Sequence, residues 1–299
     1  MRTSRGRGRT FRWSWLDGVL LGLIALVVLY LWRRASSEVF YRWDWSVVPE
    51  YLVYQNPETG DWRANLLMHG IYATLRLAVW GTLIALIIGV VMGCCRVSRS
   101  PFLRFVSRTY VEVTRNIPPL VIIFVFYFFI SGQIMPLLGI ADWVRQTDGA
   151  LRTVIEVSFG PPELIENILS GLLVLAVFEA AYFTEIIRAG IQSVERGQWE
   201  AGGSIGLSRY KVMRYVVMPQ AIQRTIPPLA GQLISLVKDS SMVSLISVQD
   251  LTYSGTQVAI STRKVFEIWI FVAVVYFVIC FSLSLVSRWL ERRMGRGLG

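Results

Sequence analysis

Charged side chains are scarce in this sequence. Only 17% of the 299 residues are Asp, Glu, Lys or Arg, whereas 54% are hydrophobic and the mean hydropathy is +0.51. Soluble domains usually carry about 25% charged residues, so this chain has too little charge to cover a water-facing surface. Histidine occurs once and cysteine three times, without the spacing of metal ligands. The sequence therefore predicts neither a metal site nor a catalytic residue.

A phosphate-binding loop of the form Gly-x4-Gly-Lys-Ser/Thr is also missing. The chain is therefore not expected to bind or hydrolyse ATP itself, and we expect no cofactor in it. A membrane enzyme is one class open to a hydrophobic chain, but paired His-rich motifs are absent and the single His69 excludes His-cluster chemistry.

Hydrophobic residues instead gather in long runs. Each run approaches the roughly 20 residues that a bilayer-spanning helix needs. The first run is not expected to be a cleaved signal peptide, because Trp32, Arg33 and Arg34 follow it where small residues would be needed. We predict an all-α membrane protein with about six transmembrane helices: Leu16–Trp32, His69–Cys94, Pro119–Ile140, Ile168–Ile187, Ile226–Val248 and Glu267–Leu290.

The net charge of +10 has two explanations, nucleic-acid binding or the basic loop excess of a membrane protein. If the N-terminus is inside, 20 of the 28 Lys and Arg outside the spans lie on the inner side. This asymmetry predicts cytoplasmic N- and C-termini, a lipid bilayer as partner and no nucleic acid. The inner segments are then Met1–Leu16, Cys95–Pro118, Arg188–Thr225 and Trp289–Gly299.

The long inner loop from Ile191 to Gln223 has an internal pattern. A short helix over Gln198–Ile205 is followed by Gly206, which suits a helix stop with positive φ. Small residues in that helix allow another surface to approach its backbone, and Leu207 and Tyr210 offer apolar anchors. Pro219 is expected to break the chain before the next span. The pattern predicts insertion into a groove on another protein.

The same loop resembles the permease subunits of ABC importers, whose pattern is Glu-Ala-Ala-x3-Gly-x9-Ile-x-Leu-Pro. Flanking motifs narrow the resemblance to polar amino-acid permeases, the histidine, glutamine, glutamate and arginine group. It covers about Leu66 to Arg293, with Gly202, Val216 and Met218 as departures. The motifs are Arg115-Asn116-Ile117-Pro118, Ala181–Gly190, Gly197-Gln198-Trp199-Glu200-Ala201-Gly202, Gly206, Met218-Pro219-Gln220-Ala221 and Lys238-Asp239-Ser240-Ser241.

The resemblance implies a five-helix type I importer core with one extra N-terminal helix. The expected domains are 1–65 (basic segment, first helix and extracytoplasmic loop), 66–293 (the permease core) and 294–299 (a cytoplasmic tail). Within the core, a coupling helix at about 198–207 would contact the ATPase. The coupling residues are Gly197, Gln198, Glu200, Ala201, Gly202, Gly206, Leu207, Pro219 and Gln220, with Glu200 as a charge near the helix start.

By the same resemblance, the protein would sit in a bacterial inner membrane and import a polar amino acid. Expected partners are two copies of an ATP-binding subunit, which would hold ATP and Mg²⁺, and an extracytoplasmic amino-acid-binding protein. A second permease, identical or a sister chain, would complete the pore. A secondary transporter driven by an ion gradient is the alternative, although it would not need the coupling motif.

Polar residues within or beside the spans are candidates for the substrate path, because charge in a membrane is costly. Glu179 could meet an ammonium group, with Tyr182 one turn on, or could pair with Arg76 or Lys238. Arg115, at the inner end of the third span, could bind a carboxylate, pair with an acid or mark topology. Lys238 and Asp239 could form a gate, a subunit contact or an ion pair. Glu185 and Arg188 are expected to pair locally, and the charge class of the substrate stays open.

Overall fold

The computed structural model describes residues 15–38 and 41–295. The chain forms two compact units, Met1–Asp44 and Trp45–Gly299. The first contains α1 (Trp15–Glu38), which coincides with the predicted first span, although its apolar stretch Trp15–Tyr30 is shorter than the four spans below. The predicted basic segment before residue 15 and residues 296–299 of the predicted tail lie outside the described residues. The predicted domain boundary at residue 65 stays a prediction.

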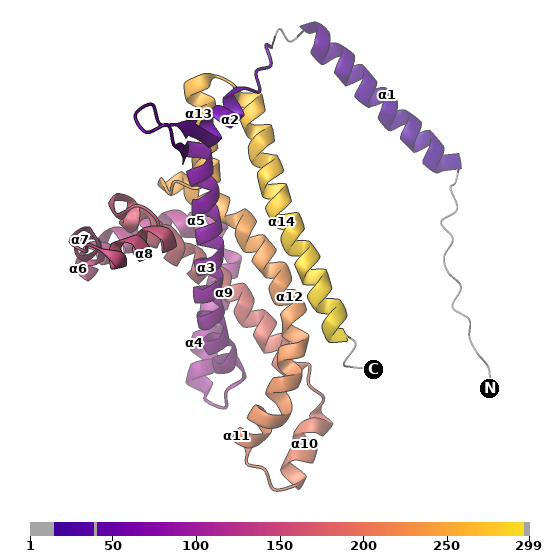
Figure 1. Cartoon of the computed structure of the whole chain (residues 1–299). Helices are drawn as coiled ribbons and strands as arrows, with labels where there is room; N and C mark the ends of the chain where they lie inside the picture. Colours follow the sequence, from indigo (N-terminus) through magenta and orange to yellow (C-terminus); the bar gives the residue numbers. More distant parts are fainter. Residues whose placement is uncertain (1–14, 39–40, 296–299) are drawn as a thin grey trace. The chain divides into compact units, whose positions relative to one another are not determined.

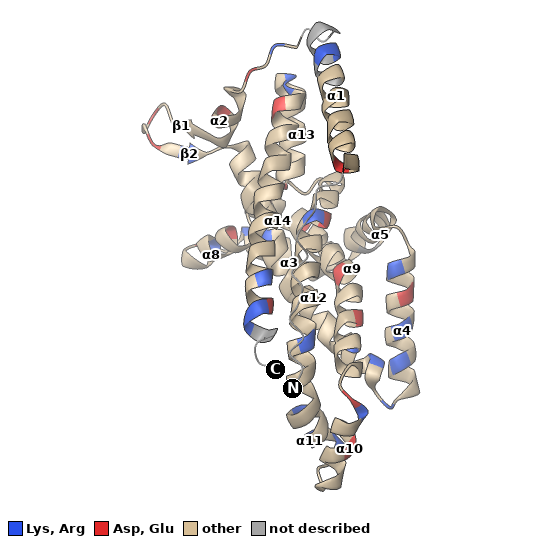
Figure 2. Ribbon diagram, turned by 90° about the vertical axis from the view of Figure 1, so that its right-hand side faces the viewer, with Lys and Arg blue, Asp and Glu red and all other residues tan. Residues whose placement is uncertain are grey.

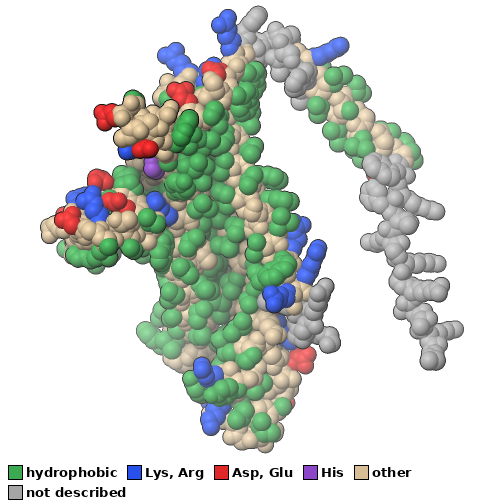
Figure 3. Space-filling model, viewed as in Figure 1, with side chains coloured by type: hydrophobic (Ala, Val, Ile, Leu, Met, Phe, Trp, Pro, Cys, Tyr) green, Lys and Arg blue, Asp and Glu red, His purple; other side chains and the backbone are tan. Residues whose placement is uncertain are grey.

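The second unit is built around four helical segments that are long and apolar enough to cross a bilayer (Figure 1). Each of them overlaps a predicted span, namely the second, fourth, fifth and sixth. Figure 3 shows hydrophobic side chains over the flanks of these long helices, as a lipid-facing surface requires. The segments are Leu66–Val97, Pro162–Gln192, Arg209–Ile246 and Val265–Arg293, and the helices within them are α3 (Leu66–Val97), α9 (Ile165–Gln192), α12 (Met218–Asp239) and α14 (Val265–Gly295).

The predicted third span, Pro119–Ile140, is helical from Pro119 to Leu138, through α5 (Pro119–Val125), η1 (Phe126–Ser131) and α6 (Gly132–Leu138). The predicted inner loop before it is instead α4 (Pro101–Asn116), which meets α5 (Pro119–Val125) at an angle of 111°. The bend follows from Pro118 and Pro119, because a residue before proline avoids the helical region and Ile117 is extended, with ψ of 136°. If the bent pair counts as one span, the described residues contain up to five spans besides the shorter apolar helix Trp15–Tyr30, and the count of about six stays a prediction.

Shorter helices and two strands connect the long helices. Before the start of α3, strands β1 (Val53–Gln55) and β2 (Trp62–Ala64) pair antiparallel, with Tyr54 opposite Arg63, so the predicted extracytoplasmic loop includes a small hairpin. The remaining elements are α2 (Val47–Leu52), β1 (Val53–Gln55), β2 (Trp62–Ala64), η1 (Phe126–Ser131), α6 (Gly132–Leu138), α7 (Ile140–Arg145), α8 (Ala150–Ser158), η2 (Pro162–Leu164), α10 (Arg196–Ser204), α11 (Arg209–Val212), η3 (Met213–Val217), η4 (Ser240–Ile246) and α13 (Leu251–Thr262).

A stripe of small residues on α3 sets its packing against α9. Gly81, Ala85, Gly89 and Gly93 are buried at or near four-residue spacing on one face, the pattern that lets membrane helices approach closely. A Cβ added at Gly89 would lie 2.6 Å from the Cβ of Phe183. Backbone proximity, more than side-chain interdigitation, therefore determines the α3–α9 distance.

Pro219 does not break the chain, contrary to the prediction. The helical segment runs from Arg209 to Ile246 as one candidate span. Pro219 lies in the first turn of α12, directly after the π-helical turn η3 (Met213–Val217). The wider π turn accommodates the missing N–H and the proline ring, so the return to the membrane is a continuous helix.

A buried carboxyl group ties α13 to α14 at the end of the unit remote from α10. The Asp250 Oδ1 caps α13 by accepting from the Tyr253 N–H at 2.8 Å, and its Oδ2 accepts from the Tyr276 hydroxyl at 3.1 Å. The Leu251 N–H donates to Thr74 on α3 at 3.1 Å. Burial raises the pKa of Asp250 to about 7.

Candidate functional site

The helix predicted from the long loop is present as α10, at the far end of the unit from α13 (Figure 1). Gly206 has φ of +82°, as the predicted stop requires. The Leu207 N–H bonds the carbonyl of Gly202 at 3.2 Å and the Gly206 N–H bonds that of Gly203 at 3.0 Å. This pair of bonds is a Schellman ending, so Gly206 fixes where α10 ends and where the chain turns back.

Small residues on α10 serve two different surfaces. Gly202 is buried, and a Cβ there would lie 2.9 Å from a Val212 methyl group, so its small size is required within the chain. Gly203 has nothing within 4 Å of an added Cβ, and Ala201 is exposed. Ile205 is 76% exposed. The outer face of α10 is therefore small, apolar and uncovered in this chain.

The inner face of α10 is tied to the start of α12. The Gln220 side chain donates to that of Gln198 at 3.3 Å. Leu207 packs against a buried cluster that includes Val212 and Val217. A displacement of α10 would therefore act directly on α12.

Glu200 does not lie at the helix start, as the sequence reasoning placed it. It follows Arg196, the first residue of α10, by one turn and accepts from its Nε at 3.0 Å. Both side chains are largely exposed, so this pair adds little to stability. Gly197, which follows Arg196, has open space around an added Cβ.

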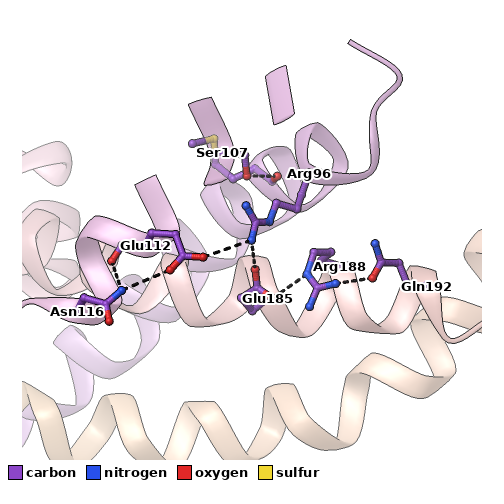
Figure 4. A network of polar contacts seen from close by, with 8 residues as sticks. Arg96, Ser107, Glu112, Asn116, Glu185, Arg188 and Gln192 are labelled. Atoms are coloured by element: carbon purple, nitrogen blue, oxygen red, sulfur yellow. Dashed lines mark hydrogen bonds and ion pairs between the residues drawn. The ribbon is translucent and has the colours of Figure 1, made fainter. Parts of the chain in front are cut away.

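An ion-pair network joins α3, α4 and α9 near the same end of the unit (Figure 4). The Arg96 guanidinium lies 3.1 Å from the carboxylate of Glu185 and 4.0 Å from that of Glu112. Glu185 also pairs with Arg188 at 2.7 Å, which confirms the predicted local pair, and Arg188 donates onward to Gln192. Three helices are thus held by one carboxylate–arginine chain that sequence spacing alone did not indicate.

Two of the predicted path residues meet at the bend between α4 and α5. Arg115 is in the last turn of α4, and not at the inner end of a third span as predicted. Its guanidinium carbon lies 5.3 Å from the ring centre of Tyr182, within cation–π range. Tyr182 also lies within electrostatic range of Glu179 and Asp239. Tyr182 therefore lies between a cation from the bend and the two acidic residues of the path.

Glu179 is fully buried midway along α9. One carboxylate oxygen accepts from the side-chain amide of Gln232 at 2.8 Å, and the other accepts no hydrogen bond from the described residues. The carboxyl group of Asp239 is its neighbour. A buried acid pair of this kind is costly unless a cation or a proton accompanies it.

The alternative pairing of Glu179 with Arg76 or Lys238 is wrong. Arg76 donates instead to the carbonyl of Val157 at 2.9 Å. Lys238 lines a groove on another face of α12, beside Trp269 and Tyr276 on α14. Among the five predicted path residues, Tyr182 lies within electrostatic range of Arg115, Glu179 and Asp239. Lys238 also lies within electrostatic range of Asp239, although it lines the separate groove.

Sequence reasoning missed Gln232 and Ile205. Gln232 lies seven residues before Asp239, so both fall on one face of α12, a spacing that could have drawn attention to it. Ile205 was included in the predicted helix but not recognised as an exposed apolar residue, because exposure depends on how α10 packs.

Comparison with known proteins identifies the family of this chain. Residues 85–296 match the family described as "Binding-protein-dependent transport system inner membrane component". The chain is 34% identical over 230 residues to the "Probable glutamine ABC transporter permease protein GlnM" of Bacillus subtilis (strain 168), covering 77% of this chain and 94% of that one. It is 31% identical over 239 residues to the "Glutamine transport system permease protein GlnP" of Escherichia coli (strain K12), with coverages of 78% and 97%.

Solved structures agree in fold. A chain of an "amino acid ABC transporter with histidines" superposes with a TM-score of 0.61 at 30% identity, covering 76% of this chain and 94% of that one. A chain of the MetNI methionine ABC transporter, 17% identical with a TM-score of 0.52, shares the fold. This multi-pass membrane protein belongs to the family of binding-protein-dependent transport system inner membrane components.

Proposed function

We propose that the chain is the permease subunit of an ATP-driven importer of polar amino acids, and that α10 is its contact with the ATPase. The names of its relatives support the transport of amino acids. One observation carries the coupling role. The outer face of α10, with Ala201, Gly203 and Ile205, is uncovered, while its inner face is tied to α12.

In the proposed cycle, closure of two ATPase subunits pushes α10, and its contacts with α12 pass the movement to the spans. ATP and Mg²⁺ are held by those partners. An extracytoplasmic binding protein delivers the amino acid at the opposite end, and a second permease, identical or a sister chain, completes the path. The orientation that suits this cycle places α10 and both termini in the cytoplasm, as the distribution of Lys and Arg predicts.

The polar cluster at the bend is the proposed substrate path. Arg115 is exposed, so it offers a cation for the substrate carboxylate. Glu179 and Asp239 offer acceptors for the substrate ammonium group, and Gln232 orients Glu179. A zwitterionic amino acid carries both charges, so it complements a path that holds one cation and one acid pair.

The coupling role is tested by placing a charge on the outer face of α10. Ile205→Arg should lower co-purification of the ATPase by at least tenfold while the chain still inserts, because a desolvated arginine replaces an apolar contact. Ile260→Arg on α13 is the matched control, since Ile260 is 70% exposed and Ile205 76%. Equal ATPase recovery from both variants would remove α10 from the interface.

The substrate path is tested on Glu179. Glu179→Gln keeps the shape of the side chain but removes its charge, so the apparent affinity for amino acids should fall by about tenfold or more while ATPase co-purification is kept. Glu166→Gln, near the start of the same helix, is the control. Uptake kinetics that are the same in wild type and Glu179→Gln would leave Glu179 a packing role only.

A further inference from the structure

A groove of about 680 Å³ lies beside α10, between the last turn of α3 and the segment from α11 to the start of α12. Three arginines line it, Arg99 from the α3 side and Arg209 and Arg214 from the other. All three are exposed. Figure 2 shows basic residues at this end of the long helices. Pro219 and Tyr210 of the predicted coupling loop line the groove, whereas the outer face of α10 and the substrate path lie elsewhere.

The charge in the groove is not compensated within the described part of the chain. No carboxylate there lies within 4.0 Å of these arginines, whereas Arg96 has two and Arg188 and Arg196 have one each. The two arginines on the α11 side lie over aromatic rings instead. Arg209 is 6.0 Å from the Trp199 ring and Arg214 is 5.9 Å from the Tyr215 ring. The groove therefore presents positive charge that no carboxylate of the described residues neutralises.

The rest of the groove is apolar. Met218 and Ile222 line it along α12, and Tyr215 is 65% exposed beside them. Because α12 continues from here into a membrane span, the groove runs from a cluster of arginines at the water boundary onto a lipid-facing surface. A free phosphate would satisfy only the first part. An amphipathic ligand with an anionic head and an apolar tail satisfies both.

We propose that this groove binds an anionic phospholipid of the leaflet on the α10 side, with its phosphate on the arginines and its acyl chains along Met218 and Ile222. The inference rests on the proposed function only in assigning α10 to the cytoplasmic side. One wall of the groove is the segment that α10 acts on, since Val212 contacts Gly202. A bound lipid thus supports the base of α10 from the membrane side.

Native mass spectrometry of the assembled complex tests the proposal. The complex is released from detergent that contains phosphatidylglycerol or phosphatidylcholine with the same acyl chains. The wild-type complex should retain more phosphatidylglycerol than phosphatidylcholine. Each arginine removed should weaken retention about fivefold, so the triple variant should lose on the order of a hundredfold. The triple variant is Arg99→Gln, Arg209→Gln and Arg214→Gln.

Two further variants keep the result interpretable. Replacement of the same three arginines by lysine keeps the charge and should keep the lipid. A second triple variant, Arg63→Gln, Arg145→Gln and Arg263→Gln, removes the same charge outside the groove. It should also retain phosphatidylglycerol. Retention of phosphatidylglycerol by the glutamine variant of the groove, or equal retention of both lipids by wild type, overturns the proposal.

The same spectra separate this proposal from the coupling role, because they count ATPase subunits as well as lipids. If the groove variant loses the ATPase but keeps phosphatidylglycerol, the groove is a protein contact and the lipid proposal is wrong. If Ile205→Arg keeps the ATPase while the groove variant loses lipid, the lipid proposal stands and the assignment of α10 as the ATPase contact falls.

Discussion

Gly89→Ala should destabilise the protein by forcing α3 away from α9. The added Cβ would lie 2.6 Å from the Cβ of Phe183 and 3.3 Å from its backbone carbonyl carbon. Neither atom can move without its helix, so the strain cannot be relieved by a change of rotamer. Overpacking of this kind costs about 1–3 kcal/mol, and the higher helix propensity of alanine returns up to about 1 kcal/mol. We expect a net loss of about 1–2 kcal/mol.

The matched control for this change is Gly231→Ala. Gly231 is also inside a long helix, α12, but nothing lies within 4 Å of its added Cβ. The free energy of unfolding can be measured by titrating sodium dodecyl sulfate into detergent micelles and following helicity by circular dichroism. Gly231→Ala should be neutral or slightly stabilising. If the two variants unfold at the same detergent fraction, close backbone approach does not determine the α3–α9 packing.

Three further outcomes are expected. Gly202→Val should lower ATPase co-purification about tenfold, because an added Cβ lies 2.9 Å from Val212, whereas Gly203→Ala should not. Arg96→Gln should lower the free energy of unfolding by about 2 kcal/mol in the same titration, since the largely buried Glu185 loses one of its two arginine partners and α3 is released from α9. Burial raises the pKa of Asp250 from 3.8 to about 7, so the native state binds a proton that the unfolded state has released. Wild-type stability should therefore fall by about 1.4 kcal/mol per pH unit across that window, and Asp250→Asn should abolish this slope in thermal unfolding between pH 4 and 8.

Hydrophobic runs predicted four of the long helices well, because each run is long and mostly apolar, and amphipathic packing is not needed to recognise it. They failed at α4, whose sequence carries Arg104, Arg108 and Arg115 and therefore resembles a basic loop. The hydropathy of a window records how apolar a run is, but not its direction. The 111° bend after α4 arises from local backbone restrictions at Pro118 and Pro119.

The end of α10 could be predicted because Gly206 marks it locally. The contacts of the path residues could not be predicted from the sequence. Arg115 and Tyr182 are far apart in sequence, and they meet only because the bend places the end of α4 against α9. Likewise, sequence identifies Glu179 as a charge in a span but does not select Gln232 over Arg76 as its partner. Local signals predicted elements, whereas partner choice required the packing of three helices.

The central claim is that α10 couples this chain to an ATPase. Its most direct test is uptake of radiolabelled amino acids into proteoliposomes that contain the complete complex and its binding protein. Uptake should require ATP on the α10 side and should be lost in Ile205→Arg but not in Ile260→Arg. Uptake that persists on an ion gradient after the ATPase subunit is removed would contradict the account.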